Sequence, residues 1–296
     1  AANAAFWLDT KNLCFVSSTY YMTELPDYAQ RVNADIKNNK EAQKAGSRIG
    51  YTPLCGTLTT DMAIAALQGE RLGLGHATDM LCVSYSQTDV IGHEWGTRGD
   101  HTDEAYIQLD RDLARLLEAL DSQVGKGNYL LFLTADHGAA HNWHFANDHK
   151  MPGGPLYIDD IKKAIDDCVA QKLGATKAVV DDILDYRVYL NHQSIDEQGL
   201  DLLQVKATVI DHLRTMEGVV TVVDYEQART TAIPQLLAER ILMGYHPRRS
   251  GDIVFIPEPQ HYSWWATTVD THTTHGEWNP YDAHIPLLFF GWHVGH

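Results

Sequence analysis

The sequence predicts an α/β fold, a three-layer sandwich with a mostly parallel central sheet between helices. Segments with strand character alternate with segments of helical spacing along the chain. Two apolar runs, Tyr129 to Thr134 and 284–291, are typical of strands buried on both faces. Acidic and imidazole side chains adjoin both runs, at the ends of strands, where open α/β sheets place their functional groups.

The first half of the chain supplies the elements of this sheet. Apolar residues at helical spacing predict helices over 26–38, 58–72 and 103–120, and the last has Asp103 and Glu104 in its first turn. Strands are expected at 13–18, 80–85 and 129–134, and Cys82 is interpreted as a small core residue of the second. The strand at 80–85, the helix and the strand at 129–134 would form a right-handed βαβ unit.

After residue 153, short helical and strand-like stretches alternate and few ionisable residues cluster at strand ends, which predicts an inserted α+β lobe over 154–264. The core domain would then consist of residues 1–153 and 265–296. The lobe is expected to contain three helices and three strands, which are helices at 158–173, 201–216 and 234–244 and strands at 187–190, 219–224 and 252–256.

Composition limits the class of partner. The chain has 296 residues, of which 44% are hydrophobic, so it can bury a sizeable core. Lys and Arg number 23 against 39 Asp and Glu, and the net charge of -16 opposes binding to nucleic acid or to an anionic membrane surface. The four cysteines are widely separated, which argues against a thiolate zinc site and a dithiol redox motif.

Asp89 and His93 are the first candidate metal ligands. They lie four residues apart in "SQTDVIGHEWG", directly after the predicted strand at 80–85. If this segment is helical, the two side chains project from the same face. A carboxylate with an imidazole suits zinc or a neighbouring first-row metal better than calcium, which prefers oxygen ligands throughout.

Asp136, His137 and His275 are the second group of candidates. Neighbouring side chains on a strand point to opposite faces, so Asp136 and His137 converge only if the chain bends after the strand. A positive φ at Gly138 is the expected source of that bend. His275 precedes Gly276 in the same way.

Together the segments predict a polynuclear metal site, but each has a second interpretation when taken alone. Asp-His-Gly is also typical of a simple turn at the end of a strand. Asp89 with His93 is also typical of an acid at a helix start and a surface histidine.

Three motifs give the chain a specific resemblance. "TDVIGH", "LTADHGAAH" and "TTHG....YDAHIPLLFFG" resemble the metal-binding blocks of the alkaline phosphatase superfamily. The similarity is to secreted bacterial phosphatases among the type I phosphodiesterases and nucleotide pyrophosphatases. It implies an alkaline-phosphatase-like sheet and two Zn²⁺ ions, the first held by Asp89, His93 and His275 and the second partly by Asp136 and His137.

The resemblance also implies an activity. The expected reaction is hydrolysis of small phosphate monoesters by the two-metal site, in a protein of the periplasm or the exterior. Two alternatives stay open: a phosphodiesterase or nucleotide pyrophosphatase with the same ligands, and a metal-binding fragment without catalytic activity.

The sequence departs from the family pattern at its ends. The family's nucleophile, a Thr or Ser at a helix start, and a further Asp of the second zinc site are expected upstream of residue 1, so the predicted sheet would be incomplete. The chain opens without Met and stops soon after the apolar run at 284–291, which fits this expectation. Thr57, Thr59 and Thr60 follow Gly56 in "CGTLTTD" but match a later family segment, so no catalytic residue is predicted among the 296.

Overall fold

The computed structural model describes residues 4–264 and 271–295. The chain divides into two compact units, the first made of Ala1–Ala135 with Pro286–His296 and the second of Asp136–Ile285. The predicted domains, 1–153 with 265–296 and 154–264, stay a prediction, and residues 265–270 of the predicted core fall outside the described part. Both units contain helices and strands, so the fold is mixed α/β, as predicted.

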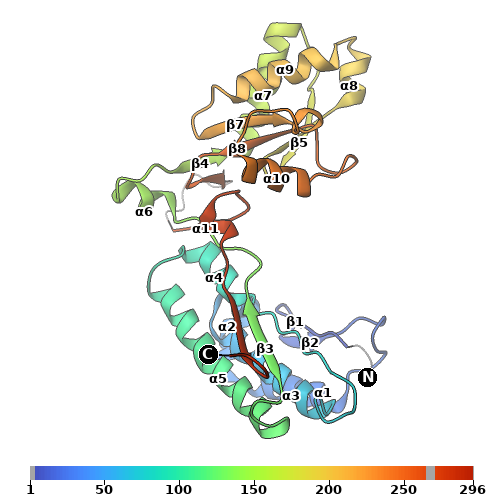
Figure 1. Ribbon diagram of the computed structural model, residues 1–296, viewed down its shortest axis with the longest axis vertical. Helices are drawn as coiled ribbons and strands as arrows, with labels where there is room; N and C mark the ends of the chain where they lie inside the picture. Colours follow the sequence, from blue (N-terminus) through green and yellow to red (C-terminus); the bar gives the residue numbers. More distant parts are fainter. Residues whose placement is uncertain (1–3, 265–270, 296) are drawn as a thin grey trace. The chain divides into compact units, whose positions relative to one another are not determined.

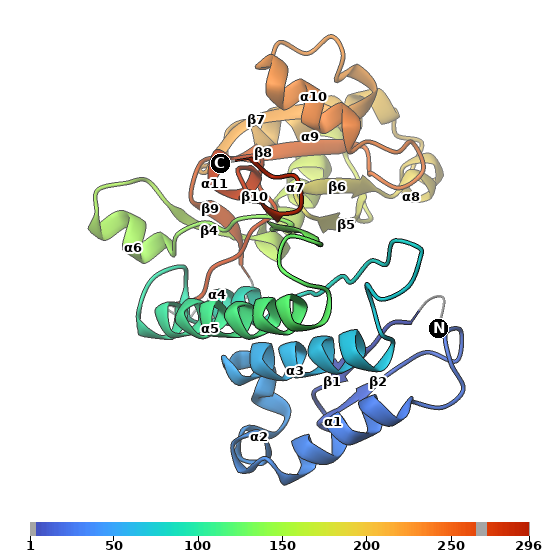
Figure 2. The ribbon, with the colours of Figure 1, turned by 60° about the horizontal axis from the view of Figure 1, so that its bottom comes forward.

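The first unit is mainly helical (Figures 1 and 2). Its elements in chain order are β1 (Trp7–Asp9), β2 (Cys14–Val16), α1 (Asp27–Asn38), α2 (Lys40–Ala45), the 3-10 helix η1 (Gly46–Tyr51), α3 (Leu54–Gly69), α4 (Gln87–Trp95), α5 (Asp100–Gln123), β3 (Leu130–Thr134) and β10 (Leu287–Gly291). Helix α5 confirms the helix expected at 103–120, and Asp100 and Asp103 occupy its first turn. The helices expected at 26–38 and 58–72 correspond to α1 and α3.

The core of this unit lies between the β1–β2 hairpin and helices α1, α2 and α3. Phe15, Ile36 and Ile49 are buried there, and Leu58 and Met62 of α3 pack against them. Figure 2 shows α3 between α1 and α5. Burial of these apolar side chains away from water is the main force that holds the helices together.

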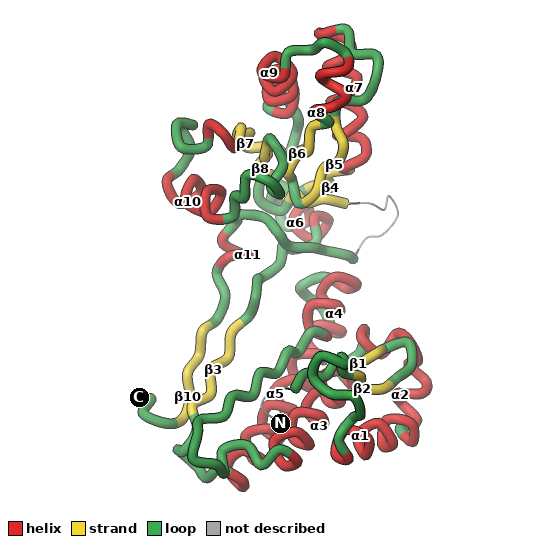
Figure 3. The backbone as a smooth tube through the Cα atoms, turned by 90° about the vertical axis from the view of Figure 1, so that its right-hand side faces the viewer, coloured by secondary structure: helices red, strands yellow, loops and turns green. Residues whose placement is uncertain are grey.

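Strands β3 and β10 form an antiparallel pair, visible as two adjacent yellow segments in Figure 3. Phe132 lies opposite Phe289 in this register. The prediction that both strands are buried on both faces is wrong, since Phe132 is 52% exposed and Leu288 is 60% exposed. The physical reason is that each strand pairs only with the other in the described part of the chain, where no central parallel sheet is formed.

The strand expected at 80–85 is also absent from the described structure. This segment has no regular secondary structure and pairs with no other described strand, so the predicted βαβ unit does not form among the described residues. Cys82 is exposed rather than a core residue, because its segment joins none of the described sheets.

The second unit is an α+β structure. Its elements in chain order are α6 (Trp143–Asp148), β4 (Gly154–Tyr157), α7 (Ile158–Leu173), β5 (Val180–Leu184), β6 (Arg187–Leu190), α8 (His192–Glu197), α9 (Leu202–Leu213), β7 (Val219–Asp224), the 3-10 helix η2 (Tyr225–Gln227), α10 (Gln235–Met243), β8 (Ile253–Pro257), β9 (His261–Trp264) and α11 (Pro280–Ala283). The helices and strands expected between 158 and 256 all match elements of this unit. Strands β4 and β9 pair in parallel.

A four-stranded antiparallel sheet of order β5-β6-β8-β7 forms the centre of this unit. Its strands alternate between two apolar clusters. Phe255 faces the cluster that contains Val209 of α9, and its neighbour Val254 faces the cluster that contains Ile241 of α10. Helices therefore cover both faces of the sheet, α7 and α9 on one and α10 on the other (Figure 1).

None of the helices in 4–264 and 271–295 combines the length and the apolar character that crossing a bilayer requires.

Lys206 forms a buried ion-pair network beside the sheet. The residue is 3% exposed, and its Nζ lies 2.9 Å from Glu226 Oε2 and 3.4 Å from Asp224 Oδ1. Burial lowers the pKa of Lys206, but the hydrogen bond to Glu226 and the charge of Asp224 outweigh it and raise the pKa overall. While Glu226 and Asp224 are ionised, the raised pKa means that the pairing stabilises the fold fully below pH 10.5, the ordinary lysine value, and is lost as pH rises through the native pKa.

Replacing Lys206 by Met should destabilise the chain by about 3 kcal/mol, because Asp224 would remain buried without its counter-charge. Urea unfolding at neutral pH measures this loss. Lys163→Met is the matched control: its ion pair with Asp167 is exposed, so the change should stay below about 1 kcal/mol. Equal losses in the two variants would contradict the argument.

Cys82 and Cys55 should differ in reactivity toward a thiol reagent. Burial raises the pKa of the Cys55 thiol to about 11, while Cys82 is exposed. We expect rapid labelling of the native 296-residue chain at Cys82 and slow labelling at Cys55. Cys14 and Cys168 are partly exposed and should label more slowly than Cys82. Cys82→Ser should therefore remove the fastest phase, and an unchanged rate and amplitude of that phase in this variant would contradict the described exposure.

Candidate metal centre

Helix α4 presents Asp89 and His93 on one face. Ile91, on the other side of the helix, is buried in the first unit and fixes the rotation of α4. His93 Nε2 lies 3.4 Å from Asp89 Oδ1, and both side chains are partly exposed. The helical i,i+4 geometry expected from the sequence is confirmed. The carboxylate and imidazole are close enough to bind one cation.

His137 directly follows Asp136 beyond the end of β3. Its Nδ1 lies 2.8 Å from the carbonyl oxygen of Gly138. In the tautomer with the proton on Nδ1, that nitrogen donates to the carbonyl and Nε2 keeps a lone pair for a metal. Asp136 Oδ2 lies 3.5 Å from His137 Nε2, and the Asp136 side chain is 88% exposed. The adjacent residues therefore do converge, as predicted.

His275 lies against His137. The two rings stack with their centroids 3.4 Å apart and an angle of 16° between their planes. Gly276, with φ of +103°, turns the chain directly after His275. The second unit thus brings together Asp136, His137 and His275, and the first unit brings together Asp89 and His93.

The role predicted for Gly138 is wrong in its mechanism. Gly138 is not among the glycines with positive φ. Its constraint is space, because a Cβ at this position would overlap the carbonyl oxygen of Tyr281. The Gly138 N–H also donates to the Asp282 carbonyl oxygen at 2.7 Å. Glycine is needed for a close approach of two backbones rather than for a left-handed bend.

Sequence reasoning missed two buried acids beside these histidines. Asp282 is 4% exposed, and its Oδ2 accepts hydrogen bonds from the N–H groups of Gly276 and Glu277, both at 2.7 Å. Burial, followed by the negative charge of Asp282, raises the pKa of Glu277 to about 8. The sequence did contain one indication of these acids: Glu277 and Asp282 lie in "HGEWNPYD", between His275 and an apolar strand.

The threonines that follow Gly56 make local hydrogen bonds, and their rejection as nucleophiles stays a prediction. Thr57 Oγ1 donates to Asp112 Oδ2 at 2.8 Å. Thr59 Oγ1 donates to the Cys55 carbonyl at 2.9 Å, and Thr60 is fully buried.

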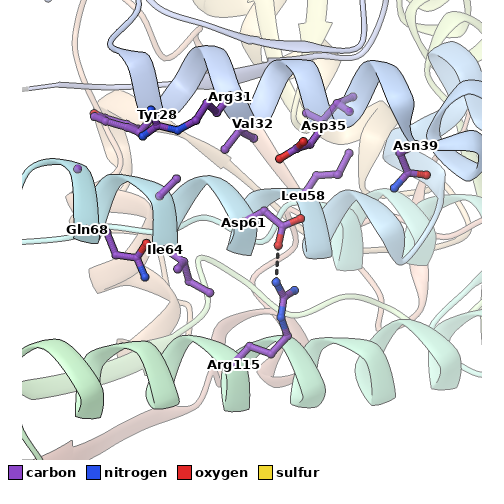
Figure 4. A pocket seen from close by; sticks show the side chains of 13 residues that line it. Tyr28, Arg31, Val32, Asp35, Asn39, Leu58, Asp61, Ile64, Gln68 and Arg115 are labelled. Carbon is purple, nitrogen blue, oxygen red and sulfur yellow. Dashed lines mark hydrogen bonds and ion pairs between the residues drawn. The ribbon is translucent and has the colours of Figure 1, made fainter.

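A pocket in the first unit contains none of the five predicted ligands. This pocket, of about 580 Å³, lies between α1 and α3 and is bordered by Arg115 of α5 (Figure 4). An ion pair joins Arg115 to Asp61 within it. Its lining combines aliphatic and charged side chains without a histidine or cysteine, so it is a poor site for zinc.

Comparison with known proteins tests the motif resemblance. The sequence pattern of the type I phosphodiesterase / nucleotide pyrophosphatase family matches residues 1–278. The chain belongs to this family. The resemblance inferred from the three motifs is therefore confirmed.

Individual proteins similar to this chain extend the comparison. A Myroides odoratus protein named calcium-transporting ATPase is 37% identical over 99% of this chain and 61% of its own length. Alkaline phosphatase PafA of Elizabethkingia meningoseptica is 34% identical over 98% of this chain and 60% of its own length. The crystal structure of wild-type alkaline phosphatase PafA matches with a TM-score of 0.88 at 32% identity, over 97% of this chain and 62% of that chain. The chain of 296 residues thus spans about three-fifths of the length of each of these three proteins.

Gly138→Ala should destabilise the 296-residue chain by about 3 kcal/mol, because the added methyl group forces two backbones apart. Gly75→Ala is the control, since a Cβ there meets nothing within 4 Å, and its effect should stay below about 1 kcal/mol. Urea unfolding compares the two variants. Full stability of Gly138→Ala would show that the close approach is not required.

Proposed function

We propose that this chain is the metal-binding part of a zinc-dependent phosphatase that hydrolyses small phosphate monoesters. The observation that supports this most strongly is the stacked pair His137 and His275. Two imidazoles from segments far apart in sequence lie in direct contact, with Asp136 adjacent. This arrangement places carboxylate and imidazole groups together, as the metal-binding blocks of the family would require.

The proposed ligands divide between two ions. Asp89, His93 and His275 hold the first zinc, and Asp136 with His137 contributes to the second. Imidazole nitrogen and carboxylate oxygen are ordinary zinc ligands, whereas calcium would prefer oxygen throughout. The hydrogen bond from His137 Nδ1 to the Gly138 carbonyl fits this assignment, because metal-bound histidines usually donate their other ring N–H to such an acceptor.

The phosphatase named among the relatives supports the same chemistry for the longer protein. When bound, a pair of zinc ions polarises the phosphoryl group and stabilises the attacking and leaving oxygens. The residues of this chain hold and orient that pair. Asp89 and Asp136 neutralise only part of the charge of two divalent cations, and the positive remainder favours a dianionic phosphate monoester as substrate.

The nucleophile is proposed to lie outside these 296 residues. Thr57 and Thr59 donate their hydroxyls to nearby acceptors, and Thr60 is fully buried. The larger size of the relatives is consistent with a further contributing segment. A further consequence is that the 296-residue chain should bind zinc and show negligible turnover of an aryl phosphate.

Phosphodiester hydrolysis is the second candidate function, because the family that matches the chain is described by that activity. The same metal ligands would serve both reactions. The charge argument favours the monoester, since a diester carries one negative charge on its phosphate and a monoester carries two.

A location in the periplasm or outside the cell is also proposed, on the motif resemblance to secreted phosphatases alone. Fractionation of the source cells tests it directly.

Zinc content and turnover of the natural-length protein test the proposed site. The unaltered protein should contain two zinc ions per chain and hydrolyse an aryl phosphate. Asp89→Ala and His137→Ala should each lower the zinc content and reduce kcat/KM at least about 100-fold, since each removes a direct metal ligand.

His76→Ala is the control for these variants. His76 is exposed and belongs to none of the three motifs, so its removal should leave zinc content and turnover unchanged. Unaltered zinc content and turnover in the Asp89→Ala variant would contradict the proposed site.

The preference between ester classes needs its own measurement. We expect the natural-length protein to have a higher kcat/KM for an aryl phosphate than for the matching bis-aryl phosphate. A preference for the diester would replace the phosphatase proposal by the phosphodiesterase.

A further inference from the structure

Asp282 connects the two turns that present His137 and His275. Its side-chain Oδ2 accepts from the N–H groups of Gly276 and Glu277, directly after His275. Its main-chain carbonyl accepts from the N–H of Gly138, directly after His137. All three donor–acceptor distances are 2.7 Å, so a single residue ties both turns together.

We propose that Asp282 is a positioning residue for the metal site, acting through main-chain hydrogen bonds rather than by binding metal. A charged carboxylate is a stronger acceptor for N–H groups than a neutral oxygen. Asp282 is 4% exposed, so water does not compete for these bonds. The carboxylate therefore limits how far the His275 turn can move away from the His137 turn.

Hydrogen bonds of the neighbouring residues Tyr281 and Glu277 hold Asp282 in place. The neighbouring Tyr281 hydroxyl accepts from the Gln260 N–H at 2.8 Å, just before β9. Glu277 Oε1 accepts from the Tyr186 hydroxyl at 2.9 Å, at the turn between β5 and β6. The segment that contains Asp282 is thus anchored at two places in the second unit.

The close approach at Gly138 makes this arrangement sensitive to small changes. The Gly138 position leaves no room for a side chain against the Tyr281 carbonyl, and the His137 and His275 rings are already in contact. A shift of the 281–282 backbone must therefore move the His137 turn. Loss of the Asp282 carboxylate would release the His275 turn at the same time.

This inference rests on the proposed zinc site, and zinc affinity tests it separately from activity. In the natural-length protein, competition with a chelator should show that Asp282→Ala weakens zinc binding by about 10- to 100-fold, the range typical of residues that orient metal ligands. Asp282→Asn keeps an acceptor oxygen of the same shape without the charge. Its loss of affinity should be smaller than that of Asp282→Ala, at roughly threefold, because the acceptor is kept and only its charge is removed.

Asp166→Ala is the matched control. Asp166 Oδ1 also accepts from two consecutive N–H groups, those of Val179 and Val180, in the same unit but at neither histidine turn. Its replacement should lower stability in urea and leave zinc affinity unchanged. A general loss of stability would instead weaken zinc binding in both alanine variants.

The outcomes separate this inference from the proposed function. Absence of zinc binding by the unaltered protein would refute the zinc site itself. Zinc binding that is equally tight in the unaltered protein and in folded Asp282→Ala would refute only the positioning role. If Asp282→Ala does not fold, Asp282→Asn decides: weaker zinc binding supports the role, and unchanged affinity overturns it.

Discussion

The candidate site depends on a backbone contact between two segments that are far apart in sequence. Gly138 approaches the carbonyl of Tyr281 so closely that only glycine fits, and its N–H donates to Asp282. This contact sets the turn of His137 against the segment that follows His275. The stacked imidazoles are its consequence, since each ring is carried by one of the two joined turns.

Local patterns in the sequence predicted helices α1, α3, α5, α7, α9 and α10 and strands β6, β7 and β8 well. Helix α7 begins and ends at the predicted residues, 158 and 173, because its buried apolar side chains recur at helical spacing. Strand β3 was predicted correctly, but its predicted burial on both faces was wrong. An apolar run indicates that a strand is able to be buried, whereas actual burial depends on neighbouring strands that local sequence does not specify. The segment at 80–85 and Cys82 were misjudged for the same reason.

The proposed metal ligands could be named from the sequence, whereas the backbone contacts around them could not. Asp89 and His93 follow from i,i+4 spacing, and His137 follows from its place at the end of a strand. The requirement for Gly138 was correctly located but attributed to φ, because crowding by Tyr281 is a long-range contact. Asp282 was overlooked for a related reason: its main role here is to accept main-chain N–H groups, and such partners leave no spacing pattern in a sequence.

Anomalous diffraction at the zinc absorption edge, from crystals of the natural-length protein, tests the central claim most directly. We predict two zinc peaks, one within coordination distance of Asp89, His93 and His275 and the other bound by Asp136 and His137. Zinc peaks elsewhere in the molecule, or a metal site that leaves out Asp89, would contradict the account.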